Sequence, residues 1–259
     1  MKKYLALIFL TNFTFSCGGA DSTQSNQYPQ PPQNNPPSNI TSYIIPLYSY
    51  PIGQYQSQWQ ALYKLQTSKQ VLVIIDPNSG PGAQADPNFT NAIATLKSKD
   101  FKVLGYVHTS YGQRDIQSVE DDINNWFSLY GDANIDGIFL DEASTNDQYF
   151  SYYQTLYNYI KSFGNKLVVL NPGTNIELKF FNIADKIVVF EDSESNYETF
   201  AHNNYLSENS DNVCTIVYSA PQDKVSFVET KSLQNNSSCD YITNGDNNTG
   251  YFYLSSYLK

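Results

Sequence analysis

The chain has 259 residues with a formal net charge of −10, which is enough sequence for one large domain or two small ones. Such an acidic chain is a poor partner for nucleic acid, because the phosphates would repel it, whereas a cationic or neutral polymer fits better. Only two histidines and three cysteines are present. These are too few and too scattered for a His- or Cys-based metal centre, so we expect no metal and no cofactor.

The N-terminus has the features of an export signal. Lys2 and Lys3 precede an apolar segment that ends near Leu10, and Cys17 follows Ser16. This pattern predicts a lipoprotein-type signal peptide at residues 1–16, with Cys17 as the lipidated residue of the mature protein. The apolar segment is too short to span a bilayer as a retained helix. We therefore expect a lipid-anchored bacterial envelope or cell-surface protein, with ordinary secretion as the alternative.

Residues 17–40 form a segment rich in Pro, Asn, Gln and Ser with almost no large apolar side chains. Such a segment cannot bury enough surface to offset the entropy of ordering it, so we expect a disordered linker. Its proline-rich part, Pro29 to Pro37, should be extended and should hold the following domain away from the membrane. The remaining residues, 41–259, are predicted to form one catalytic domain, which we expect to be a monomer that meets the membrane only through the lipid anchor.

Strand and helix signals alternate along residues 41–259. Strands are predicted at 43–50, 71–76, 102–109, 135–141, 167–170, 186–190, 213–218 and 251–254. Helices are predicted at 54–67, 87–99, 116–129, 147–163, 177–183, 196–203 and 223–233. Because most of the strands are continuous apolar runs, they indicate a parallel sheet covered by helices. Eight such units in this length favour an α/β fold of the closed (β/α)8 TIM barrel type.

Polar and acidic residues follow several of these strands. In a barrel of this kind the carboxyl ends of the strands meet at one face, which holds the active site. Two carboxylates at such a face are typical of enzymes that cleave sugars: one donates a proton to the leaving oxygen, and the other acts as nucleophile or activates water. A strand end taken alone could instead be a helix cap. The predicted catalytic acids are Asp141, Glu142 and Glu191, and the predicted substrate-binding residues are Tyr48, Asp76, Asn78, Tyr106, His108 and Asn171.

Five ordered motifs resemble those of the spherulin 4-like family. They are the segments at 75–82, 105–109, 137–142, 171–174 and 190–191. The resemblance implies a (β/α)8 barrel and a glycoside hydrolase that acts on α-1,4-linked galactosamine and N-acetylgalactosamine in microbial exopolysaccharide. It also implies that Asp141, Glu142 and Glu191 are the functional acids. Within that trio we assign Asp141 as nucleophile, Glu191 as acid/base and Glu142 as a supporting acid.

Two positions depart from the family pattern. Asp76 stands where the family often has Asn, and His108 stands where Pro or another residue is common. These departures affect the expected substrate and leave the reaction class unchanged. The stereochemical course, retaining or inverting, stays open at this point, because the separation of the two carboxylates decides it.

Three further expectations complete the prediction. A non-catalytic carbohydrate-binding surface lipoprotein is the alternative function on the same barrel. A structural surface protein whose tyrosine-rich face contacts other cells or matrix is a third possibility, since the chain has 22 tyrosines. In an exported protein, Cys214 and Cys239 are expected to form a disulfide, because oxidising compartments favour pairing.

Overall fold

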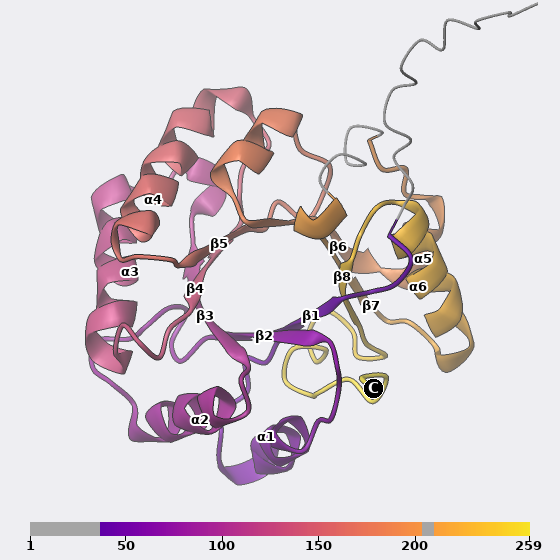
Figure 1. Cartoon of the computed structure of the whole chain (residues 1–259), viewed down its shortest axis with the longest axis horizontal. Helices are drawn as coiled ribbons and strands as arrows, with labels where there is room; N and C mark the ends of the chain where they lie inside the picture. The colour runs from indigo at the N-terminus through magenta and orange to yellow at the C-terminus, as the bar shows by residue number, and fades with distance from the viewer. Residues whose placement is uncertain (1–36, 204–209) are drawn as a thin grey trace, which may run out of the picture. The chain divides into compact units, whose positions relative to one another are not determined.

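Eight parallel strands close into a barrel in which each strand pairs with its sequence neighbour and β8 pairs with β1 (Figure 1). A computed structural model describes residues 37–203 and 210–259 of the chain. The closed ring of parallel strands confirms the predicted (β/α)8 fold. The strands are β1 Ser42–Pro46, β2 Gln70–Ile75, β3 Lys102–His108, β4 Gly137–Asp141, β5 Leu167–Leu170, β6 Lys186–Ser193, β7 Val213–Tyr218 and β8 Cys239–Ile242.

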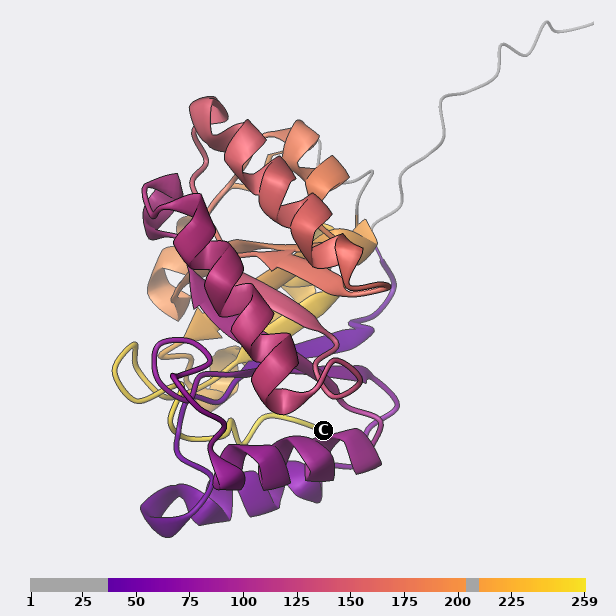
Figure 2. The same cartoon turned by 90° about the vertical axis from the view of Figure 1, so that its left-hand side faces the viewer.

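The helices lie outside the ring of strands (Figures 1 and 2). Asp86 begins α2 with a side chain that accepts the N–H groups of Asn88 and Phe89, and Pro87 occupies the first helical position, as expected for a stable helix start. The connection between β5 and β6 is only a 3-10 helix, η4 Leu178–Ile183, where the sequence predicted a helix. The α-helices are α1 Gln56–Tyr63, α2 Pro87–Ser98, α3 Ile116–Tyr130, α4 Phe150–Ser162, α5 Glu194–Thr199 and α6 Val225–Gln234, and the other 3-10 helices are η1 Gly53–Tyr55, η2 Ser110–Gly112, η3 Asp147–Tyr149 and η6 Gln222–Lys224.

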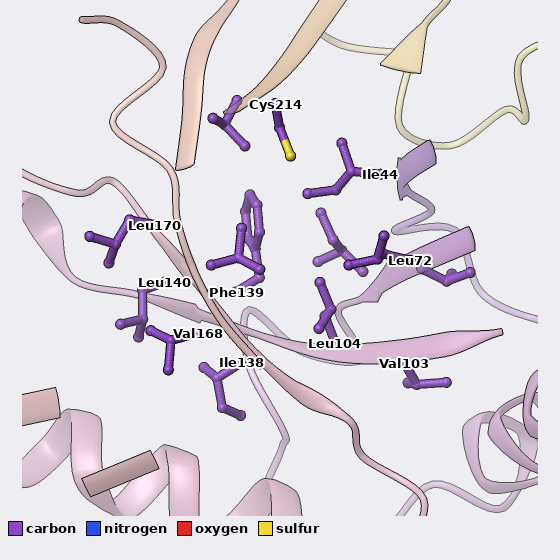
Figure 3. Packing of buried hydrophobic residues seen from close by; sticks show 14 of the residues in the cluster. Ile44, Leu72, Val103, Leu104, Ile138, Phe139, Leu140, Val168, Leu170 and Cys214 are labelled. Atoms are coloured by element: carbon purple, nitrogen blue, oxygen red, sulfur yellow. The ribbon is translucent and has the colours of Figure 1, made fainter. Parts of the chain in front are cut away.

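Alternating side chains of each strand fill two layers of core. Leu104 and Phe139 point into the ring, while their neighbours Val103 and Ile138 point outward (Figure 3). All four are buried. Both faces of the sheet are therefore apolar, which explains why the strands appear in the sequence as continuous apolar runs.

The predicted signal peptide at 1–16, the lipidation site Cys17 and most of the predicted linker at 17–40 lie outside the described residues. Within the two described ranges, no helix has the length and apolar character needed to cross a membrane.

Gly137 sets the position of β4, the strand that ends in Asp141. A Cβ atom at Gly137 would lie 2.2 Å from the carbonyl oxygen of Leu167 on β5. This contact is with backbone, which cannot move aside without separating the two strands. Glycine is therefore required at this position for β4 to pair closely with β5.

The prediction of the eighth strand at 251–254 is wrong. The strand that closes the barrel is β8, Cys239–Ile242, in a stretch whose polar composition hid it. It is only four residues long, and it includes Asp240, which is unusual in a buried strand. The apolar residues at 251–254 belong instead to the loop after β8, at the carboxyl-end face of the barrel.

The predicted disulfide is also wrong, because Cys214 and Cys239 are buried free thiols. The two residues are register partners on β7 and β8. Neighbouring strands lie about 4.7–4.9 Å apart, and parallel side chains keep their Cβ atoms at a similar spacing. A disulfide needs a Cβ separation of about 3.8 Å, so adjacent strands in register do not favour it.

Asp240 gives the barrel a measurable dependence on pH. Its side chain is 2% exposed, and burial raises its pKa to about 8 even though Lys69 lowers it. Because the folded state holds this proton more tightly than the unfolded chain, its contribution to stability is full below about pH 4 and is lost as the pH rises through about 8.

We expect Asp240→Asn to increase the free energy of unfolding at pH 9 by roughly 2 kcal/mol, since the neutral amide avoids a buried charge. At pH 4 the same substitution should change it little. Denaturant unfolding at both pH values measures the difference, with Asp121→Asn on the exposed surface of α3 as the matched control. An equal effect of Asp240→Asn at both pH values would contradict this prediction.

Candidate active site

Four of the predicted site residues meet at the carboxyl ends of neighbouring strands. Tyr106 lies on β3, Asp141 ends β4, Asn171 directly follows β5, and Glu191 lies on β6. Hydrogen bonds join the four side chains into one chain, from Tyr106 through Asp141 and Asn171 to Glu191. These strand ends therefore converge, as the alternating strand and helix pattern predicts for a barrel.

A β-bulge turns Glu191 into the barrel. Val188 pairs with Cys214, and after the bulge Phe190 pairs with Thr215 and Glu191 with Ile216. Phe190 packs outward, with its ring centroid 4.6 Å from that of Tyr197. In a regular strand Phe190 would point inward and Glu191 outward, because side chains alternate. The extra residue reverses that alternation and directs the carboxylate to the site.

Asn171 joins the two carboxylates. Its Nδ2 donates to Asp141 Oδ1 at 2.7 Å and to Glu191 Oε2 at 2.5 Å. The orientation of the Asn171 amide is fixed, because its Oδ1 accepts the backbone N–H of Gly173 at 3.1 Å. Since both acceptors are bonded to one nitrogen, these two carboxylate oxygens lie within about 5 Å of each other.

Each carboxylate also accepts a tyrosine hydroxyl. Tyr106 donates to Asp141 Oδ2 at 2.7 Å, and Tyr251 donates to Glu191 Oε1. Tyr48 lies between these two tyrosines, with its ring centroid 5.5 Å from each of theirs. Burial first, and then the neighbouring carboxylate, raise the pKa of Tyr106 and of Tyr251 well above the ordinary value. Both hydroxyls therefore stay protonated and act as donors.

The two carboxylates differ from ordinary surface acids. Burial first, and the charge of Asp141 second, raise the pKa of Glu191 to about 7. Burial also raises the pKa of Asp141, against the hydrogen bonds from Tyr106 and Asn171. Two close carboxylates with raised pKa values can share one proton near neutral pH. The pair therefore combines a proton donor with an ionised carboxylate.

Glu142 has a strained backbone. Its φ angle is +52°, in the left-handed region that side chains other than glycine seldom adopt. The strain is held by the loop after β3, because the carbonyl oxygen of Glu142 accepts the N–H of Tyr111 at 2.7 Å and the hydroxyl of Thr109 at 2.9 Å. Glu142 directly follows Asp141 in the chain, and its charge adds to burial in raising the pKa of Asp141.

The remaining predicted residues lie around this centre. Asp76 accepts the N–H of Gly80 at 2.6 Å and so holds its own loop. Burial raises the pKa of Asp76, and the charge of Asp141 raises it further, against the Gly80 hydrogen bond and the charge of His108. Asn78 is exposed in the same loop. His108 is partly exposed, and its backbone carbonyl accepts from Arg114 at 3.0 Å. Asp76 and His108 thus lie close to the carboxylate pair, and Asn78 lies in the loop that Asp76 holds.

Asp192, the acid next to Glu191, is occupied by the fold. Its oxygens accept the N–H of Ser193, the hydroxyl of Tyr218 and the side-chain amide of Asn196, at 2.6, 2.8 and 2.8 Å. Burial raises the pKa of Asp192, but these hydrogen bonds together outweigh it and lower the pKa below its ordinary value. Asp192 therefore stabilises the start of α5 and stays ionised. Of the two adjacent acids, Glu191 is the one that can hold a proton near neutral pH.

Sequence reasoning missed Tyr251. It assigned this residue to an eighth strand, so the side chain was not considered for the site. Only the correct position of β8 places the following loop over Glu191, and no local pattern at 251 signals that contact.

In the described ranges, no cluster of three or more His, Cys, Asp or Glu side chains is arranged to hold a metal ion.

Comparisons with known proteins identify a matching family, a curated relative and a similar solved structure. Residues 42–259 match the family described as Spherulin4, spherulation-specific family 4. Spherulin-4 of Physarum polycephalum is 40% identical over 166 residues, which cover 63% of this chain and 47% of that protein. The chain thus spans about half the length of this curated relative. Among solved structures, Sph3 of Aspergillus clavatus in complex with GalNAc is 26% identical with a TM-score of 0.71, covering 86% of this chain and 95% of that one.

Proposed function

The chain belongs to spherulation-specific family 4, and from this premise we propose that it is an endo-acting glycoside hydrolase. We propose that its substrate is an exopolysaccharide that contains α-1,4-linked galactosamine or N-acetylgalactosamine. The sugar in the complex of the related Aspergillus clavatus protein is GalNAc, which supports an amino-sugar substrate. The observation that carries the reaction class is the pair Asp141 and Glu191, joined by Asn171.

The spacing of the pair supports a retaining mechanism. Retaining glycosidases hold their two carboxyl groups about 5–5.5 Å apart, and inverting enzymes about 6.5–9.5 Å, to leave room for water. Both Asp141 Oδ1 and Glu191 Oε2 bond to one nitrogen, at 2.7 and 2.5 Å. That limits the separation of these two oxygens to about 5 Å, which lies at the spacing of retaining enzymes and below that of inverting ones.

The roles follow from the electrostatics. Glu191, whose pKa is raised to about 7, donates a proton to the glycosidic oxygen as Asp141 attacks the anomeric carbon, and the C–O bond to the leaving sugar breaks. Glu191 then removes a proton from water, which attacks the same carbon and releases Asp141. Tyr106 and Asn171 stabilise the Asp141 carboxylate when it leaves, and Tyr251 orients Glu191. Glu142 is proposed as a supporting acid.

The pH profile tests the assignment of Glu191. As general acid it must be protonated, and the protonated fraction falls as the pH rises through about 7. We therefore expect kcat/KM to decrease roughly tenfold per pH unit above that value. Initial rates between pH 4 and 9 measure this decrease in kcat/KM. Protein that is kept at pH 9 and then assayed at pH 6 controls for unfolding. A constant kcat/KM up to pH 9 would be inconsistent with this role.

Product analysis tests the function itself. Wild type should release oligosaccharides of several lengths from an α-1,4-linked N-acetylgalactosamine polymer, or from its partly deacetylated form, with new reducing ends. Binding to these polymers without any new reducing ends would instead support the carbohydrate-binding alternative.

An extracellular polymer substrate fits the export signal predicted at residues 1–16. We propose that lipidation at Cys17 anchors the protein, and that the following segment holds the barrel away from the membrane. In this arrangement the carboxyl-end face of the barrel meets the polymer outside the cell.

A further inference from the structure

Three aromatic side chains beside the site form a second feature of the same face. Phe252 stacks on Tyr55 at 5.7 Å between ring centroids, with an angle of 24° between the rings. Tyr253 meets Tyr55 edge-on at 5.4 Å. We call these three residues the aromatic rim. Phe252 and Tyr253 are 38% and 49% exposed, although large aromatic side chains are usually buried.

The aromatic rim is continuous with the catalytic pair. Phe252 and Tyr253 directly follow Tyr251, which bonds Glu191, so they begin within about 7 Å of it along the backbone. Tyr55 ends η1 in the connection after β1, which also carries Tyr48. The two loops are joined, since Tyr48 N–H donates to the carbonyl of Tyr251 at 2.7 Å.

The rim also has a fixed conformation. The N–H of Leu254 donates to Gln58 Oε1 on α1 at 3.0 Å, and the N–H of Phe252 donates to the carbonyl of Thr249 at 3.0 Å. The Leu254 bond and the Tyr48 bond to Tyr251 attach the loop after β8 to the rest of the barrel on both sides of Phe252 and Tyr253, and the Phe252 bond closes a turn within the loop. The rings are therefore held in place before any ligand binds, which lowers the entropic cost of binding.

The composition around the rim indicates a neutral ligand. Residues 47–63 and 247–258 contain no Asp, Glu, Lys or Arg, although the chain as a whole carries a net charge of −10. The first of these stretches instead has four glutamines, at 54, 56, 58 and 60. Aromatic faces favour the C–H surface of a sugar ring, and amide and hydroxyl groups bond its hydroxyls. A charged protein partner would find no complementary charge here.

We infer that the aromatic rim is a sugar-binding subsite, which holds uncharged pyranose units of the polymer beyond the bond that is cleaved. This inference rests on the proposed function and adds to it a place for the extended chain. Units with a free ammonium group gain nothing from this surface, so the rim should favour N-acetylated units. Because only a long polymer reaches both the carboxylate pair and the aromatic rim, the rim would let the enzyme distinguish a long polymer from a short fragment.

The test measures binding apart from cleavage. In an Asp141→Asn background, whose turnover is expected to be at least about 10⁴-fold lower, Phe252→Ala with Tyr253→Ala is expected to weaken retention in native gels containing an α-1,4-linked N-acetylgalactosamine polymer by roughly tenfold. Phe227→Ala on α6, at 40% exposure, is the matched control and should bind as the background does. Tyr253→Trp with Phe252→Tyr keeps both rings and should preserve binding, and melting temperatures confirm folding.

In the active background, the double alanine variant should lose roughly tenfold in kcat/KM on the polymer and keep the wild-type value on a short aryl glycoside. Equal polymer affinity in the alanine and control variants would overturn the subsite. An equal loss of polymer binding in the variant that keeps both rings, Tyr253→Trp with Phe252→Tyr, would also overturn it. If wild type cleaves no polymer but its binding still depends on the rim, the proposed function fails and the subsite stands.

Discussion

Replacing Asp141 by Asn is expected to lower kcat on the polymer at least about 10⁴-fold. In the proposed mechanism Asp141 forms the covalent bond to the sugar, and an amide cannot do so. The change is nearly isosteric, and Asn171 and Tyr106 surround the position, so folding should be preserved. The measurement is the rate of release of reducing ends at pH 6.

The control for this prediction is Asp121→Asn, an exposed position on α3, which should keep wild-type activity. Azide and an activated aryl glycoside distinguish the loss of the Asp141 nucleophile from a general disturbance of the site. Added to Asp141→Ala, azide can attack the anomeric carbon once and give a glycosyl azide of inverted configuration. Activity of Asp141→Asn within tenfold of wild type would show that another group is the nucleophile.

Replacing Glu191 by Gln is the second large effect, with an expected loss of about 10²–10⁴-fold in kcat on the polymer. Glutamine has no proton to give to the leaving oxygen, and it cannot activate water in the second step. The loss should be smaller on an aryl glycoside with a good leaving group, because that bond breaks without protonation. Comparison of the two substrates measures this difference.

Glu120→Gln on α3 is the matched control and should leave both rates unchanged. Azide again identifies the role. With Glu191→Ala it should attack the sugar already bound to Asp141, so the glycosyl azide retains its configuration through two inversions. If Glu191→Ala with azide gave an inverted product instead, the roles of Glu191 and Asp141 would have to be exchanged.

The barrel could be predicted because its signals are local. Continuous apolar runs such as the one that forms β2 have the pattern of buried parallel strands, and their alternation with helices determines the fold class. The carboxyl end of each such strand faces the same side of a barrel. For that reason the sequence alone could place Asp141 and Asn171 at a common site.

The eighth strand could not be predicted in this way. Cys239–Ile242 is short and contains a buried Asp240, so its local pattern resembles a loop. It is a strand because β1 and β7 both present unpaired edges, and pairing with them satisfies its backbone groups. That pairing is a long-range contact which no stretch of sequence displays.

Local patterns along the chain were enough to predict the barrel, the family and the presence of Asp141 on β4 and Glu191 on β6. How these two acids lie relative to each other depends on contacts between distant parts of the chain. The bulge after Val188 turns Glu191 inward, and Asn171 holds it near Asp141. The loop after β8 brings Tyr251 to Glu191 and presents the aromatic rim beside it. These features depend on strand register and on where distant loops meet, which follow from the closure of the barrel and not from local residue preference.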